Sequence, residues 1–188
     1  MFPLPYPFQL RPVRDDDQSF VDMLYDSTRA DLKEIAVDHA VVGQLIKMQQ
    51  QMQSRVFQAD FPGAHYLILM RGDDRIGRLV IDLGAKTLHM VDLALCPTAR
   101  CQGGGTVVLR ALQEWAAGRG LIVALSVSHG NPAARRLYHA LGFELSEDDA
   151  VQAQLRWRPD TAADDARAHW QHRAAGESGG ATRHLTGK

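Results

Sequence analysis

ARCQGGGTVVLRAL, residues 99–112, places three glycines in a row directly before an amphipathic segment. Glycine loses more backbone entropy on ordering than any other residue, so a run of glycines weakens local structure. Val108, Leu112 and Trp115 follow at helical spacing, which predicts a helix over 106–117. We infer that the chain keeps this backbone bare because a ligand must come close to it.

A loop that leads into a helix presents backbone N–H groups that have no partner inside the helix, and these attract anions. The loop does not end as a Walker-type phosphate loop does, because Thr106 follows Gly105 with no lysine between them. It also lacks the dinucleotide motif G-x-G-x-x-G, because Val108 stands at the last position. The pattern Arg-x-x-Gly-x-Gly fits residues 100–105, and a pyrophosphate is the expected guest.

The segments around the loop alternate between strand-like and helix-like periodicity. Strands are predicted over 8–13, 65–71, 75–83, 87–96, 121–128 and 151–157, and another begins at Phe143. Helices are predicted after the acidic residues 15–18, over 38–57 and 106–117, and from Pro132. The order β-α-α-β-β-β-α-β-α-β-β predicts a mixed α/β (α+β) fold with a central antiparallel meander.

The predicted helix over 38–57 carries an apolar stripe with mostly three- and four-residue steps. Such a stripe is typical of a helix face that packs on a core, and we interpret it in this way. Its members are Val41, Val42, Leu45, Ile46, Met48, Met52 and Val56.

The chain has 188 residues, of which 45% are hydrophobic, and this suits one domain with a packed core. The hydrophobic period is lost from Pro159 onward, so we predict a domain over 1–158 and a disordered tail over 159–188. A net charge of −1 gives no basic field, so neither nucleic acid nor a membrane surface is an expected partner. We find no apolar run of membrane-spanning length, and the proline-broken start does not resemble a signal peptide.

Cys96 and Cys101 are the two cysteines of the chain. A disulfide framework needs more cysteines, and a metal site needs a second pair of ligands at matching spacing. We therefore expect two reduced thiols, no metal and a cytoplasmic location.

LALCPTARCQGGGTVVLRAL, residues 93–112, resembles motif A of the GNAT superfamily of N-acetyltransferases, in which an apolar strand, a proline and the glycine pattern precede a helix. NPAARRLYHALGF, residues 131–143, resembles motif B, and LIVALSVS between the motifs stands where the family has its fifth strand. The resemblance covers roughly residues 8–158. It implies a GNAT-like fold, with a mixed, mostly antiparallel sheet whose central strands splay apart between flanking helices.

The resemblance implies acetyl-CoA as co-substrate. The amides from Gln102 to Thr106 would hold its pyrophosphate, and the backbone of Leu93–Leu95 would pair with the pantetheine arm. Arg100 is either a phosphate contact or a solvated side chain, whereas Asn131 can both cap its helix and contact the CoA arm. The expected CoA-binding residues are Leu93, Ala94, Leu95, Arg100, Cys101, Gln102, Gly103, Gly104, Gly105, Thr106 and Asn131. Gly104 departs from the family, which usually has an apolar residue there.

Two residues are candidates for acid–base chemistry. Tyr138 matches the motif B tyrosine, which in the family lies near the CoA sulfur as general acid, although it would also fit a core aromatic. Asp92 is the candidate base, with His89 and Asp82 as alternatives, although a lone strand acid is often structural.

The implied activity is N-acetylation, in which a primary amine attacks acetyl-CoA directly without an enzyme nucleophile. The alternative is a GNAT-like module that binds CoA without catalysis, as a sensor or assembly subunit. The acceptor is a small-molecule or protein amine, and a homodimer is compatible with the family. In the family, the region corresponding to roughly 26–60 shapes the acceptor pocket, and an acidic lining there would suit a cationic amine. Its candidate polar residues are Tyr25, Asp26, Arg29, Asp31, Glu34, Asp38 and His39.

Overall fold

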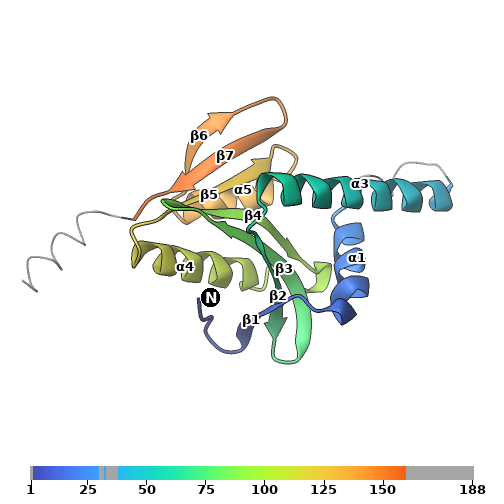
Figure 1. The fold of residues 1–188 in the computed structure, drawn as a ribbon, viewed down its shortest axis with the longest axis horizontal. Coiled ribbons are helices and arrows are strands. Elements are labelled where there is room, and N and C mark those ends of the chain that lie inside the picture. Colours follow the sequence, from blue (N-terminus) through green and yellow to red (C-terminus); the bar gives the residue numbers. More distant parts are fainter. Residues whose placement is uncertain (1, 30–31, 33–37, 160–188) are drawn as a thin grey trace, which may run out of the picture. The chain divides into compact units, whose positions relative to one another are not determined.

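The computed structural model describes residues 2–29, 32 and 38–159, and Figure 1 shows how their elements are arranged. The strands are β1 (Phe8–Pro12), β2 (His65–Arg71), β3 (Asp74–Leu83), β4 (Thr87–Leu95), β5 (Ile122–Ser128), β6 (Glu144–Asp148) and β7 (Gln152–Trp157). The helices are α1 (Gln18–Ser27), α3 (His39–Asp60), α4 (Gly104–Ala117) and α5 (Pro132–Ala140). Each predicted strand and helix is present with slightly shifted ends. Apart from Pro159, the predicted tail lies outside the described residues.

The strands form one seven-stranded sheet in the order β1-β2-β3-β4-β5-β7-β6. All neighbouring strands are antiparallel except β4 and β5, which are parallel. This confirms the mixed, mostly antiparallel fold. β1 is an edge strand, which is where a strand containing Pro12 can lie without losing a ladder hydrogen bond.

The two parallel strands β4 and β5 separate along their length. Their pairing runs from Thr87 opposite Ile122 to Met90 opposite Leu125 and goes no further, although both strands continue. The remaining residues of β4 therefore have no strand partner on the β5 side. This is the predicted splay, and it leaves a gap beside the end of the strand that leads to the glycine loop.

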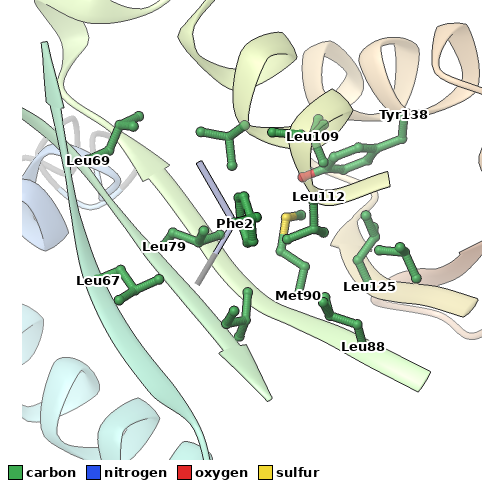
Figure 2. Close-up of a cluster of buried hydrophobic side chains, with 14 of the residues drawn as sticks. Phe2, Leu67, Leu69, Leu79, Leu88, Met90, Leu109, Leu112, Leu125 and Tyr138 are labelled. Carbon is green, nitrogen blue, oxygen red and sulfur yellow. The ribbon is translucent and has the colours of Figure 1, made fainter. Parts of the chain in front are cut away.

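The main core lies between one face of the sheet and the helices α4 and α5. Figure 2 shows Leu79 and Leu88 of the sheet facing Leu109 and Leu112 of α4 across this core. All four leucines are fully buried, and each contributes about 2 kcal/mol of transfer free energy to folding. This packing fixes where α4 begins, and so it positions the glycine loop.

The other face of the sheet carries α1 and α3. The guanidinium of Arg75 on β3 lies over the Phe20 ring of α1, with its Cζ 5.4 Å from the ring centroid. α3 packs on α1 through Val42 and Ile46, which form a small buried cluster with Tyr25.

The interpretation of the α3 stripe as core packing is wrong for most of its members. Only Val42 and Ile46 are buried, and four other members of the stripe are more than half exposed. The exposed members are Val41, Met48, Met52 and Val56. The spacing correctly predicted a helix with an apolar face, but within the described residues α1 covers only the part of it formed by Val42 and Ile46. In the described part of the chain, no helix combines the length and the apolar character needed to cross a membrane.

Candidate functional site

The glycine loop reaches α4 through two residues in the left-handed backbone region. Cys101 has φ 57° and Gly103, the N-cap of α4, has φ 80°. The N–H groups of Gly104, Gly105 and Thr106 in the first turn of α4 have no acceptor within the helix. That turn holds no acidic side chain, and Gly103 has no side chain to cap it. The start of α4 therefore presents uncapped N–H groups of the kind that bind anions, and binding of a pyrophosphate there stays a prediction.

The three glycines do not serve one purpose. Gly103 needs to be glycine because its positive φ strains other residues. Gly104 and Gly105 are buried in the first turn of α4, and a Cβ on either would make ordinary contacts at 3.5 Å or more. Backbone conformation thus explains Gly103 alone among the three.

Side chains brace the loop from two neighbouring segments. Gln102 donates from Nε2 to the Thr98 carbonyl at 2.6 Å, and its Oε1 accepts a hydrogen bond from Arg71 at the end of β2. Arg71 brings a positive charge to the loop, and it was not among the residues predicted from the sequence. Its place follows from the sheet order alone, so no local motif could have found it.

Arg100 is engaged with β4 and α1. Its Nε donates to the Leu95 carbonyl at 3.0 Å, and Nη2 donates to the Ser27 carbonyl at 3.3 Å. These bonds hold the Arg100 guanidinium against β4 and α1, and its Nη1 donates in none of them. A contact between Arg100 and a CoA phosphate stays a prediction.

The register of β4 decides which backbone groups face the gap. The Cys96 N–H donates to the Ile76 carbonyl at 2.9 Å, so these two residues form a hydrogen-bonded pair between β4 and β3. Hydrogen-bonded and non-hydrogen-bonded pairs alternate along an antiparallel ladder. Leu95 and Leu93 lie opposite Gly77 and Leu79, in the positions whose N–H and C=O groups point away from β3. Those groups face the gap, and the Leu95 carbonyl already accepts a hydrogen bond from Arg100.

Ala94 faces the other way. A Cβ on Gly77 would collide with the Ala94 carbonyl, so this carbonyl points at β3. The geometry therefore favours Leu93 and Leu95, rather than Ala94, as backbone partners for an extended ligand. This narrows the predicted Leu93–Leu95 contact to alternate residues.

A β-bulge sets the orientation of Asp92. Val80 pairs with Asp92 whereas the next residue, Ile81, pairs with Met90, so Val91 is an extra residue in β4. Directly paired residues share a face of the sheet, so Asp92 and Met90 lie on opposite faces. Strict alternation would have put both on the α4 face. The bulge instead turns Asp92 toward the face that carries α1 and α3.

Asp92 is held by a buried arginine. The Nε and Nη2 atoms of Arg78 lie 3.0 and 2.7 Å from the same carboxylate oxygen, Oδ2. Arg78 is buried and Asp92 is part-buried, so the pair fixes both side chains. Within the described residues the second oxygen, Oδ1, makes no hydrogen bond. Asp92 therefore has a structural role as the partner of Arg78, and its role as a base stays a prediction.

Tyr138 extends from α5 into the buried cluster, as Figure 2 shows. Its ring lies 5.7 Å from the Phe143 ring, centroid to centroid, and the side chain is buried. Burial, together with the negative charge of Asp92, raises the pKa of the phenol to about 12. The phenol is therefore protonated at neutral pH, as a general acid must be. Tyr138 therefore packs in the core, and the negative charge of Asp92, the candidate base, contributes to the raised pKa of its phenol.

Asn131 caps α5 as the sequence predicts. Its Oδ1 accepts a hydrogen bond from the Ala134 N–H at 3.1 Å, and Pro132 opens the helix. A contact between Asn131 and CoA stays a prediction.

A cavity of about 630 Å³ lies between the C-terminal half of α3 and the facing side of β4, β5 and β7. The α3 side contributes Gln53, Val56, Phe57 and Asp60, followed by Phe61. The sheet side contributes Thr87, His89, Met90, Val91, Asp92, Ile122, Ala124, Leu125, Ser126, Gln152, Gln154 and Arg156. The cavity thus brings Asp92 and its alternative, His89, to one wall.

The candidate acceptor residues do not line this cavity. Tyr25, Asp26, Arg29, Asp38 and His39 are absent from its walls, whereas Asp31 and Glu34 lie outside the described residues. The walls of the cavity instead combine the acidic residues Asp60 and Asp92 with the basic residues His89 and Arg156. The expectation of an acidic lining that suits a cationic amine is not tested by this cavity and stays a prediction.

Comparison with known proteins places the fold. The family model described as the acetyltransferase (GNAT) family matches residues 22–143. The chain belongs to the GNAT acetyltransferase family. In this GNAT protein the glycine loop before α4 corresponds to motif A and α5 to motif B, and the separating strands β4 and β5 stand in the predicted order. No protein of curated function matches its sequence.

Several solved structures share this GNAT fold. A PaiA N-acetyltransferase from Thermoplasma acidophilum, solved with coenzyme A, is 15% identical with a TM-score of 0.59, covering 80% of this chain and 98% of its own. An acetyltransferase from Thermus thermophilus is 20% identical with a TM-score of 0.58, over 84% and 99%. RimL, a ribosomal L7/L12 α-N-protein acetyltransferase solved with coenzyme A, is 16% identical with a TM-score of 0.59, over 85% and 98%.

Proposed function

We propose that this GNAT protein transfers an acetyl group from acetyl-CoA to a primary amine by direct attack. One observation supports the proposal: the backbone edge at Leu93 and Leu95 is open, and the chain leads from it through the glycine loop to the uncapped start of α4. The first suits a pyrophosphate, and the second suits an extended amide-containing arm. CoA has both groups in this order, so we expect its thioester at the gap between β4 and β5.

The residues around the gap supply the proton transfers. The acceptor amine loses a proton to a base, through Asp92 or His89, and its nitrogen attacks the thioester carbon. The C–N bond forms and the C–S bond breaks, and the nitrogen releases its second proton to solvent. The thiolate takes a proton from the Tyr138 hydroxyl, which solvent then reprotonates. The first turn of α4 and Arg71 hold the CoA phosphates throughout, so the protein contributes binding, orientation and two proton transfers.

The cavity between α3 and the sheet suits the acceptor. Its walls combine the aromatic rings of Phe57 and Phe61 with polar groups such as Ser126 and Gln154. Acidic and basic side chains are both present, so a small polar amine or a peptide amine fits better than a polycation. An acetyl-CoA-dependent reaction and two unpaired cysteines fit the predicted cytoplasmic location, which stays a prediction.

Thiol release from acetyl-CoA, measured against a panel of amines and peptides, tests the proposal. We expect turnover with some members of the panel, and a loss of kcat of about 100-fold in Tyr138→Phe with unchanged CoA affinity. Tyr138→Phe keeps the ring in the core, so a folding defect is not expected. CoA binding without turnover across the panel would contradict the proposed reaction.

The second candidate, a CoA-binding module without catalysis, is favoured by the Arg78–Asp92 pair. Both donated hydrogen bonds fix the carboxylate, which then serves structure rather than proton transfer. The two candidates differ in the effect of Asp92→Asn. An enzyme that uses Asp92 as base loses turnover steeply at neutral pH, whereas a binding module loses only stability and keeps its CoA affinity.

A further inference from the structure

The exposed side of α3 carries a regular apolar seam. Val41, Leu45, Met48 and Met52 recur at steps of four, three and four residues. Val41, Met48 and Met52 are 53%, 53% and 57% exposed, and Leu45 is partly exposed. Steps of this kind are the signature of a helix that packs along another helix, because they keep one stripe in line over successive turns.

This seam is separate from the face that holds α3 on the protein. The face toward α1 is made by Val42 and Ile46, and Gln50 adds a 2.8 Å hydrogen bond to Asp22 of α1. Each residue advances about 100° around a helix, which places the seam roughly a quarter turn or more from that face. The seam is therefore open to another molecule while α3 stays docked. In Figure 1 the N-terminal half of α3 extends past α1.

Opposite charges continue the seam at its two ends. Asp38 lies three residues before Val41, and Arg55 lies three residues after Met52. Asp38 is exposed and caps α3 by accepting a hydrogen bond from the Ala40 N–H at 2.9 Å. Arg55 is also exposed, and within the described residues it makes no ion pair. The acid stands at the N-terminal end of the seam and the base at the C-terminal end.

The steps between the seam residues read the same in both directions: three, four, three, four, three. Two copies of α3 laid antiparallel therefore meet in matching layers, with Asp38 opposite Arg55, Val41 opposite Met52, and Leu45 opposite Met48. Each layer occurs twice, once on each side of a twofold axis. A parallel arrangement would instead put Asp38 against Asp38 and Arg55 against Arg55, which repel.

We propose that the protein forms a symmetric dimer through an antiparallel α3–α3 pair in this register. The twofold axis passes between the two Leu45–Met48 layers, and ion pairs between Asp38 of one copy and Arg55 of the other close both ends. Gln44 and Gln51 flank the seam, so no like charges oppose the pairing. The occupant of this face is a second copy of the chain because the seam is complementary to itself in both shape and charge.

The interface is small, and this sets the expected strength. A seam of about four turns lies at or below the lower end of specific interfaces, about 1,200 Å² in total. The helices are already folded on their protomers, so pairing needs little ordering. We expect a dissociation constant in the micromolar range, and at tens to hundreds of micromolar protein the dimer dominates.

Sedimentation equilibrium over a wide concentration range tests the proposal. Met48→Glu places a carboxylate in both central layers and raises the dissociation constant by at least about tenfold. Met23→Glu is the matched control, because Met23 is equally exposed at 54% but belongs to α1. We expect it to leave the dimer intact. A wild-type protein that stays monomeric at about 200 micromolar, or a dimer that Met48→Glu leaves unchanged, overturns the proposal.

Charge reversal tests the register without relying on the apolar core. Arg55→Glu sets like charges against each other at both ends and weakens the dimer. Adding Asp38→Lys to Arg55→Glu restores opposite charges and recovers the association, with circular dichroism confirming that α3 remains folded. A failure of the double variant to dimerise better than Arg55→Glu contradicts the antiparallel register.

Discussion

Replacing Gly104 by alanine should make the protein more stable, whereas the same replacement one residue earlier, at Gly103, should make it less stable. Both glycines lie at the start of α4 and differ in backbone conformation. Gly104 is the first helical residue, and an added Cβ would lie 3.6 Å from Cε1 of Phe8 and 3.8 Å from Cδ1 of Ile76. Gly103 has φ 80°, where a Cβ is strained even though open space surrounds it.

The expected magnitudes follow from these environments. Alanine at Gly104 reduces the entropy lost on folding by about 0.5–1 kcal/mol, and its buried methyl adds about 0.8 kcal/mol. The total, about 1.5 kcal/mol, corresponds to a rise in Tm of about 3–6 °C for a chain of this length. Alanine at Gly103 costs about 1–2 kcal/mol through its left-handed conformation, so its Tm falls.

Thermal and urea unfolding measure the stability of the two variants. Calorimetric titration with CoA measures the affinity of each variant for the coenzyme. Neither replacement removes a backbone N–H, and the Gly104 methyl faces Phe8 and Ile76 in the interior. Gly104→Ala should therefore keep its CoA affinity within about twofold, a difference under 0.5 kcal/mol. A lower Tm for Gly104→Ala, or equal shifts for both variants, would refute this account of the loop.

Three further predictions concern the strands and the core. Gly77→Ala should cost about 1–3 kcal/mol of stability and weaken CoA binding, because its Cβ collides with the Ala94 carbonyl and forces β3 and β4 apart; urea unfolding and calorimetry measure both. Asp17→Asn should cost about 2–3 kcal/mol at pH 7, because it breaks a part-buried ion pair in which the buried Asp17 carboxylate lies 2.6 Å from Arg11. These contacts hold the pKa of Asp17 well below its usual range, so their stabilisation is complete above about pH 4 and is lost as the pH falls further; unfolding from pH 7 to pH 2 should show this slope for the wild type and a shallower one for Asp17→Asn. If Tyr138 is the proton donor, its pKa of about 12 predicts no loss of donor capacity up to pH 10, which a pH–rate profile of turnover checks.

The order of elements could be predicted from the sequence because each is set by local periodicity. Periods of two and of three to four residues distinguished the strands from the helices, and Gly and Pro marked their ends. The glycine loop and the Asn131 cap are also local features. The splay of β4 and β5 was implied by the resemblance to the family rather than by any residue, since nothing in either strand shows where pairing stops.

The remaining features depend on pairing between distant segments. The bulge at Val91 decides which face Asp92 occupies, but it exists only in the register between β3 and β4. Arg71 reaches the loop because β2 lies two strands from β4. The α3 stripe was misread because amphipathic spacing shows that a face is apolar without showing what covers it. In each case the missing information was the identity of the neighbour.

The central claim is that the bare first turn of α4 holds the pyrophosphate of CoA, and Thr106→Glu tests it most directly. A carboxylate in the first turn suits the helix dipole, so the protein should be as stable as the wild type or slightly more so. It also occupies the anion site with negative charge, so the CoA dissociation constant measured by calorimetry should rise at least about tenfold, whereas in Thr106→Gln, of equal size and no charge, it should change far less. If Thr106→Glu binds CoA as tightly as Thr106→Gln does, the pyrophosphate does not lie at the start of α4.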